Sequence, residues 1–170
     1  MKISIIGTGM IATEVIKMLR NEAKGIEITS IFSHSNKEKA MTLAKENDID
    51  HVYTDYAQLL KEDDADFVYI ALVNNAHYTY VRQALEAQRN VIVEKPFTST
   101  LEEAKLLAQM ARERGLYLFE AVTPLHTPNF QLVKQSLKRI APIHFAQCNF
   151  SQYSSKYERY LQGDIAPAFN

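Results

Sequence analysis

Short apolar runs alternate with longer segments in which apolar residues recur every three or four positions. The apolar runs predict six strands, at residues 2–7, 26–33, 51–54, 66–72, 90–97 and 116–121. The periodic segments predict helices at residues 11–23, 36–48, 55–63, 77–88 and 98–115. Strands that alternate with helices indicate a parallel sheet covered on both faces. The pattern therefore predicts a doubly wound α/β domain over residues 1–122.

The alternation stops after residue 122. A proline-punctuated connection at 123–130 leads into a helix expected at 129–140 and a long strand expected at 142–153, and the remaining residues indicate a loop. No later element completes this part. Residues 123–170 are therefore expected to begin a truncated α+β domain, and the chain is expected to be a fragment of a longer protein.

Composition narrows the function classes. Hydrophobic residues make up 46% of the 170 positions, and 19 Lys and Arg face 20 Asp and Glu without a basic block, so no nucleic-acid surface is expected. No apolar run reaches the roughly 18 residues of a membrane span and no secretory signal is recognisable, so a cytoplasmic location is expected. The single cysteine, Cys148, is expected to pack within the strand at 142–153. The five histidines are scattered, so no metal site is expected.

The first strand is followed by small residues at a particular spacing, G-x-G-x-x-A. Between a strand and a helix this pattern is typical of dinucleotide-binding (Rossmann) domains. Gly7 permits the tight turn, Gly9 lets backbone approach a pyrophosphate, and Ala12 allows close helix–strand packing. A tight turn without a ligand is the alternative. The residues expected to contact the cofactor here are Gly7, Thr8, Gly9, Met10, Ile11 and Ala12.

The end of the second strand bears on the choice of cofactor. In this fold an acidic residue about 20 positions after the glycines binds the ribose 2′-hydroxyl of NAD. Here Ser33 and His34 stand at that place, and no carboxylate follows before residue 38. The loop is therefore expected to accept a 2′-phosphate, and NADP(H) is favoured over NAD(H). A loop that only caps the helix after Asn36 is the alternative.

The fifth predicted strand ends in Glu94, Lys95 and Pro96. Ligands of doubly wound sheets bind outside the carboxyl ends of the strands. Lys95 is therefore a candidate for chemistry. A surface ion pair between Lys95 and Glu94 is the alternative.

With these motifs the chain resembles the Gfo/Idh/MocA oxidoreductases. The resemblance rests on GTGMIA at 7–12, on NNAHYTYVRQALEAQRNVIVEKP at 74–96 and on LFEA at 118–121. It implies a two-domain dehydrogenase that binds NAD(P) in its first domain. The second domain would supply most of the substrate pocket and commonly a homo-oligomer interface. The substrates implied are sugars, inositols or other small alcohols and carbonyl compounds.

The resemblance also implies roles for individual residues. Lys95 would be catalytic and lie at the reacting oxygen, and Glu94 would orient it and help to position the nicotinamide ribose. Asn74 and His77 match an N-x-x-H pattern near the cofactor, although His77 could instead make only a local hydrogen bond. Glu120 matches a position close to the floor of the active site. The Lys95–Pro96 bond is a candidate for the cis form.

The sequence also departs from the family. Leu72 and Val73 replace the usual Thr or Ser followed by Pro, and Leu125 stands where many members have Arg. A later helix with a catalytic Asp or Asn and a His or Tyr is lacking. A non-catalytic dinucleotide sensor or regulatory protein on the same fold is the alternative function. The retained Lys95 favours the enzyme, because a sensor has no need of an ammonium at a reacting oxygen.

Overall fold

The fold is described from a computed structural model, which covers residues 1–140, 142–154 and 157–163. Internal contacts divide the chain into two compact units, Met1–Ala121 and Val122–Asn170. Each unit is described by itself below.

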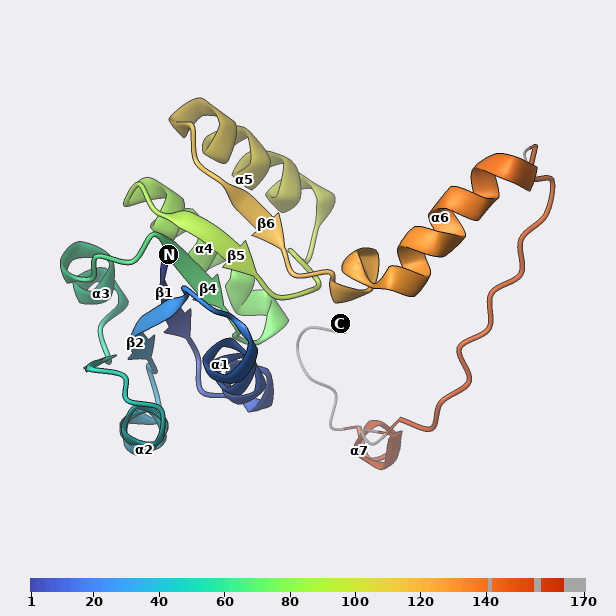
Figure 1. The fold of residues 1–170 in the computed structure, drawn as a ribbon. Coiled ribbons are helices and arrows are strands. Elements are labelled where there is room, and N and C mark those ends of the chain that lie inside the picture. The colour runs from blue at the N-terminus through green and yellow to red at the C-terminus, as the bar shows by residue number, and fades with distance from the viewer. Residues whose placement is uncertain (141, 155–156, 164–170) are drawn as a thin grey trace. The chain divides into compact units, whose positions relative to one another are not determined.

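The first unit is a parallel sheet of six strands in the order β3-β2-β1-β4-β5-β6 (Figure 1). The strands are β1 (Lys2–Ile6), β2 (Glu27–Phe32), β3 (His51–Tyr53), β4 (Phe67–Ile70), β5 (Asn90–Val93) and β6 (Leu118–Glu120). The helices are α1 (Met10–Glu22), α2 (Lys37–Glu46), α3 (Tyr56–Glu62), α4 (His77–Glu86) and α5 (Leu101–Arg114), with a 3-10 turn, η1 (Asn74–Ala76). The doubly wound α/β prediction is confirmed.

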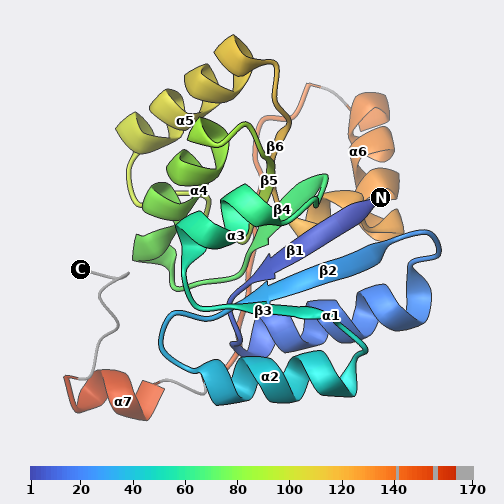
Figure 2. The same ribbon diagram turned by 90° about the vertical axis from the view of Figure 1, so that its left-hand side faces the viewer.

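Helices cover both faces of the sheet. Figure 2 shows α1 and α2 on one face and α3, α4 and α5 on the other. Two buried clusters lie on these two faces, one with Ile3 and Ile5 among its members and the other with Ile6 and Val68. A strand that is buried on both faces is mostly apolar, which explains the largely apolar sequences of β1 and β4; the buried Ser4 of β1 is an exception.

Side-chain caps fix where the helices begin. Asn36 accepts the Lys39 N–H at the start of α2, and Asp55 accepts the Gln58 N–H at the start of α3. Thr100 forms a capping box with Glu103 at the start of α5. Each of these helices therefore begins close to the boundary that residue type predicts.

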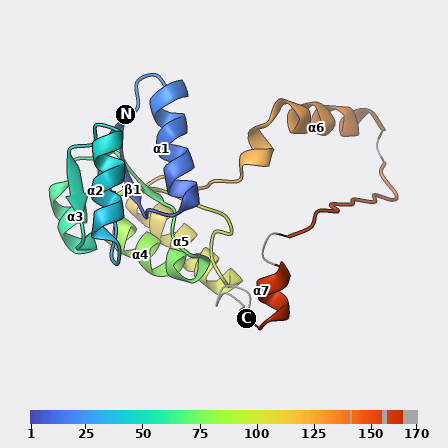
Figure 3. The same ribbon diagram turned by 90° about the horizontal axis from the view of Figure 1, so that it is seen from below.

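The second unit contains a 3-10 turn, η2 (Thr123–His126), and two helices, α6 (Pro128–Ile140) and α7 (Tyr157–Leu161). The prediction of a strand at 142–153 is wrong, since the structure assigns no strand there (Figure 3). A strand forms only when its backbone groups pair with a neighbour, and the described residues offer this segment none. Cys148 is accordingly exposed rather than packed. A short helix, α7, also replaces part of the expected loop.

Among the described residues, no helix combines the length and the apolar character that crossing a membrane requires.

Candidate functional site

The order of the strands reverses between β1 and β4, and the loops after these strands touch. Gly7, directly after β1, has φ +121° and donates its N–H to the Phe32 carbonyl at 2.9 Å. A Cβ at Gly7 would lie 2.5 Å from the carbonyl oxygen of Ala71, which follows β4. Both the backbone conformation and the close approach therefore require glycine at this position.

Gly9 is a glycine for a different reason. It is the N-cap of α1, with φ −69°, a conformation open to any residue. No heavy atom from another part of the described chain lies within 4 Å of where its Cβ would be. The fold therefore has no need of glycine here, and the space beside the turn is open to a ligand.

The start of α1 offers unpaired N–H donors. Gly9 provides no side-chain cap, and the first turn carries no acidic residue. Ala12 is completely buried, as close packing of helix on strand requires, whereas Met10 is exposed. Such a helix start suits a pyrophosphate, because free N–H groups and the positive end of the helix dipole both favour an anion.

The loop after β2 caps α2 and carries no carboxylate over residues 33–37. Ser33 is nearly buried, and its Oγ accepts the Asn36 N–H at 3.1 Å. The His34 side chain is exposed. The cap expected at the start of this helix is therefore present, made by the Asn36 side chain, which accepts the Lys39 N–H. The separate contact from the Asn36 N–H uses one acceptor site of the Ser33 hydroxyl.

Glu94 follows β5 and binds two donors. The Tyr69 hydroxyl donates to Glu94 Oε1 at 2.6 Å, and the Lys95 backbone N–H donates to Oε2 at 3.2 Å. Burial first, and then the hydrogen bond to Glu94 and its charge, raise the pKa of the Tyr69 phenol well above its usual range. Tyr69 therefore remains a proton donor to Glu94 at any physiological pH.

Lys95 is exposed, and its ammonium makes no hydrogen bond or ion pair with the part of the chain that the structure describes. The alternative of an ion pair with Glu94 is thus not realised. The Lys95–Pro96 bond is cis, as the resemblance suggested. The ammonium at the carboxyl end of β5 is available to an external oxygen.

His77, at the first position of α4, is completely buried. Its Nδ1 lies 2.9 Å from the Pro96 carbonyl oxygen and its Nε2 lies 3.1 Å from that of Leu72. The ring joins the loops that follow β4 and β5, and neither nitrogen is open to a ligand. This geometry favours the local hydrogen-bond interpretation of His77 over direct contact with a cofactor.

Two further residues frame the segment at 94–97. Glu120, at the end of β6, accepts the Phe97 N–H on Oε1 at 2.9 Å. Asn74 begins η1 and is half-buried, and no hydrogen bond to its side-chain amide is found among the described residues. The segment around Lys95 is therefore anchored by Tyr69, His77 and Glu120, while the Asn74 amide is left for a ligand.

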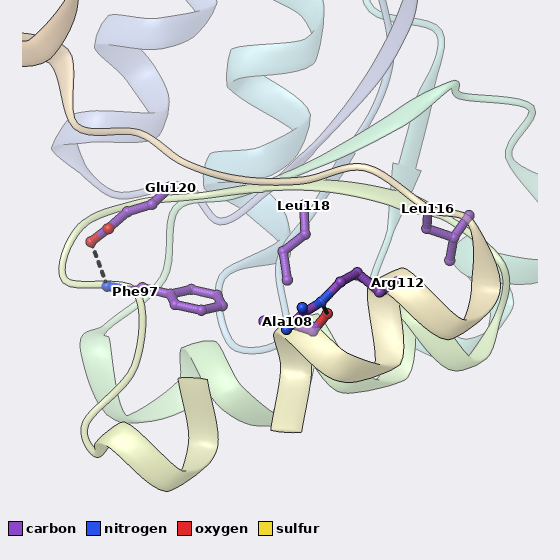
Figure 4. Close-up of a pocket in the computed structure, with 7 residues that line it drawn as sticks. Phe97, Ala108, Arg112, Leu116, Leu118 and Glu120 are labelled. Atoms are coloured by element: carbon purple, nitrogen blue, oxygen red, sulfur yellow. Dashed lines mark hydrogen bonds between the residues drawn. The ribbon is translucent and has the colours of Figure 1, made fainter. Parts of the chain in front are cut away.

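A pocket of ≈ 520 Å³ lies between α5 and β6 (Figure 4). Its lining consists of Phe97, Ala108, Ala111, Arg112, Leu116, Leu118 and Glu120. The pocket adjoins the anchored segment through Phe97 and Glu120, but none of the glycine-turn residues lines it. It is therefore separate from the start of α1.

No group of three His, Cys, Asp or Glu side chains that could hold a metal ion is found in the described ranges.

Comparison with known proteins decides the family. The Gfo/Idh/MocA model, described as an oxidoreductase family with an NAD-binding Rossmann fold, matches residues 1–122. The chain belongs to this family. The resemblance seen in the sequence is thereby confirmed, and the matched range contains both the turn at 7–12 and the E-K-P element.

Named relatives give the resemblance more detail. The chain is 33% identical to the uncharacterized oxidoreductase YgjR of Escherichia coli, over 99% of this chain and 51% of that protein. It is 28% identical to the NADP(+)-dependent scyllo-inositol 2-dehydrogenase IolU of Bacillus subtilis, over 99% of this chain and 51% of that enzyme. The chain thus spans about half the length of the curated relatives it matches.

A solved structure agrees with the fold. KijD10, a 3-ketoreductase from Actinomadura kijaniata in complex with NADP, superposes with a TM-score of 0.74 at 32% identity. The match covers 82% of this chain and 44% of that one.

Sequence reasoning missed Tyr69, because an aromatic residue inside an apolar run indicates core. A signal was nevertheless available. Tyr69 is paired with Ile92 across β4 and β5, so Glu94, two residues further, falls on the same face of the sheet.

Proposed function

We propose that the protein is an NAD(P)-dependent oxidoreductase that moves a hydride between the nicotinamide and a sugar, an inositol or a related small alcohol or carbonyl compound. The observation that carries the proposal is the Lys95 ammonium, which has no partner among the described residues and lies at the carboxyl end of β5, in a sheet whose strand order reverses at the glycine turn. Family membership supports the reaction class, and the inositol and sugar substrates named for relatives support the substrate class.

The residues of the turn fit the cofactor. Residues 7–12 would hold its pyrophosphate, because the start of α1 offers free N–H donors and Gly9 leaves room for close approach. The bound cofactor would supply or accept the hydride. Asn74, whose amide is free of hydrogen bonds to the described residues, would contact the cofactor from the loop after β4.

Lys95 would act on the reacting oxygen of the substrate. Its ammonium would polarise a carbonyl and give it a proton, or stabilise an alkoxide in the reverse direction. Glu94 would help to hold the ribose beside the nicotinamide. His77 and Glu120 would act through the backbone at Pro96 and Phe97. They would thereby fix the backbone position from which the Lys95 side chain extends.

A preference for NADP(H) over NAD(H) is part of the proposal. The loop at 33–37 has no carboxylate to repel a 2′-phosphate, and it presents an exposed imidazole and, at Lys37, an ammonium. A relative named as NADP(+)-dependent and a structural neighbour in complex with NADP support the preference.

Fluorescence titration of the 170-residue chain with NADPH and with NADH tests the cofactor. We expect saturable binding with NADPH the tighter ligand. Ser33→Asp, which keeps an acceptor for the Asn36 N–H and adds a charge, should reverse the order. Ser33→Ala is the control for loss of the hydroxyl without an added charge; it should weaken NADPH binding but not reverse the order. Tighter binding of NADH to the wild-type chain would contradict the preference.

The role of Lys95 is tested in the complete protein with a panel of sugars and inositols. Lys95→Ala should leave cofactor affinity nearly intact and lower turnover by about 10²- to 10⁴-fold, the usual range for loss of a general acid or base. Lys105→Ala, which removes an exposed ammonium from α5, is the control. Unchanged turnover in Lys95→Ala would refute the assignment and favour a non-catalytic dinucleotide sensor.

A further inference from the structure

We propose that Tyr69 is a positioning residue that keeps the Glu94 carboxylate off the Lys95 ammonium. The proposal deepens the proposed function and rests on it for its purpose, since a free ammonium is what the reaction needs. The contacts among Tyr69, Glu94 and Lys95 can nevertheless be tested without any ligand.

Glu94 and Lys95 are neighbours with opposite charges, yet they do not pair. Each carboxylate oxygen of Glu94 accepts one hydrogen bond, Oε1 from the Tyr69 hydroxyl at 2.6 Å and Oε2 from the Lys95 backbone N–H at 3.2 Å, and retains a second acceptor site. Two donors thus fix the direction of the carboxylate. The ammonium of Lys95 is left without a partner in the described part of the chain.

Tyr69 is suited to this role by its surroundings. Its side chain is 9% exposed in β4, where the core under α1 and α2 holds the ring. The hydroxyl emerges at the carboxyl end of the sheet beside Glu94. Burial raises the pKa of this phenol, so the donor does not dissociate as the solution becomes mildly alkaline.

Tyr69 differs from the other two anchors of the segment. His77 and Glu120 contact backbone atoms of Pro96 and Phe97, and so set the path of the chain. Tyr69 contacts the charged side chain of Glu94 and so leaves the Lys95 ammonium available. Without the Tyr69 hydroxyl, Glu94 Oε1 would lose its donor, and we expect the ammonium of the adjacent Lys95 to replace it.

An ion pair with Glu94 would hinder the reaction. It would occupy the donors that a substrate oxygen requires, and it would stabilise the charged form of the lysine against giving up its proton. Tyr69 therefore separates the two roles, so that Glu94 stays a neighbour of the cofactor and Lys95 a partner of the substrate.

The test measures how fast an amine-reactive reagent labels Lys95 in the folded 170-residue chain, with peptide mass spectrometry as the readout and the exposed Lys105 as internal reference. The reagent reacts with the neutral amine, which an ion pair disfavours. Tyr69→Phe should slow labelling of Lys95 about two- to fivefold, the range that a surface ion pair supports. The double variant Tyr69→Phe/Glu94→Gln should label at the wild-type rate.

Control variants keep the outcome decisive. Tyr56→Phe also removes a buried phenol, one that donates to the Tyr80 carbonyl at 3.1 Å, and it should leave labelling of Lys95 unchanged. Glu94→Gln alone should label like the wild type, because Glu94 is not paired with Lys95. Faster labelling in Glu94→Gln would overturn the proposal, and so would an unchanged rate in Tyr69→Phe.

Cofactor titration of the same variants separates the two proposals. Failure of the wild type to bind NADPH or NADH would contradict the proposed function while leaving the labelling result valid. If the wild type binds, Tyr69→Phe and Glu94→Gln should each weaken binding, and the double variant should be no worse than Glu94→Gln. Additive losses would show that Tyr69 acts independently of Glu94 and would overturn the proposal.

Discussion

The two ends of the strands in the parallel sheet differ in how their polar groups are paired. We call the end where the strands begin the amino edge and the end where they finish the carboxyl edge. At the amino edge, one cluster of polar side chains is hydrogen-bonded within itself and to the backbone. At the carboxyl edge, bound groups surround a few that are left free within the described part of the chain, namely the Lys95 ammonium, the Asn74 amide and the first N–H groups of α1. The difference fits a structural role for the amino edge and the ligand-binding role that we propose for the carboxyl edge.

The amino edge is organised around Asp63, which follows α3 and is nearly buried. Its carboxylate accepts hydrogen bonds from the hydroxyls of Thr29, at 2.8 Å, and Ser30, and from the Ala65 N–H at 3.0 Å. Arg89 donates to the backbone carbonyls of Leu60, Asp63 and Ala65. These contacts tie α3, β2 and the start of β4 together, which is a structural task.

The largest effect on stability is expected at the amino edge. Asp63→Ala leaves the buried Ser30 hydroxyl and Ala65 N–H without an acceptor, and leaves the Thr29 hydroxyl only the Ile3 carbonyl at 3.4 Å; it should lower the free energy of unfolding by about 3 kcal/mol. Urea unfolding measures the loss. Asp64→Ala removes only an exposed ion pair with Lys2 and should change stability little. An equally small effect in Asp63→Ala would show that this edge does not stabilise the fold.

Substitutions at the two glycines of the turn should have different effects, one on stability and the other on cofactor binding. Gly7→Ala should lower the free energy of unfolding by about 2 kcal/mol, because φ is positive and the new Cβ would meet the Ala71 oxygen. Gly9→Ala should unfold nearly like the wild type but bind NADPH at least about tenfold more weakly, since a methyl group would enter the space of the pyrophosphate. Urea unfolding and fluorescence titration measure the two effects. Equal losses of stability in both variants would remove the distinction.

Alkaline pH should weaken the fold through two buried phenols. Burial raises the pKa of both Tyr56 and Tyr69, so the folded chain keeps protons that the unfolded chain releases near about pH 10. The stabilising contribution is complete below that pH and is lost above it, by up to about 1.4 kcal/mol per pH unit for each phenol. Unfolding at about pH 9 and about pH 11 measures the slope. Tyr56→Phe and Tyr69→Phe should each reduce it, and an unchanged slope in both would contradict the assignment.

The smallest change in stability is expected at Lys95. Its ammonium contributes no contact to the described part of the chain, so Lys95→Ala should alter the free energy of unfolding by no more than about 0.5 kcal/mol. Thermal or urea unfolding checks this. A clear loss of stability would mean that the carboxyl edge also binds this charge, and would weaken the contrast between the two edges.

The sequence predicted those parts of the fold whose signals are local. Strand and helix positions followed from periodicity, and the caps at Asn36 and Asp55 followed from residue type. The expected strand at 142–153 failed because a strand also depends on a partner. The sequence left open whether Lys95 pairs with the adjacent Glu94. The structure shows no such pair among the described residues, and the Tyr69–Glu94 hydrogen bond is the explanation that we propose.

Other parts of the site depend on contacts between distant segments. The double contact of His77 joins residues 5 and 19 positions away, and Glu120 reaches 23 positions back to Phe97. Nothing in the local pattern specifies such pairs. The Asp63 cluster was missed for the same reason, because its two hydroxyl partners lie 34 and 33 positions earlier, in β2.

The buried ring of His77 has a consequence for motion. Because it connects the Leu72 and Pro96 carbonyls, the loops after β4 and β5 should open and close together rather than one at a time. Amide hydrogen exchange at the two loops should then follow a common rate, and a ligand that orders one loop should slow exchange in the other.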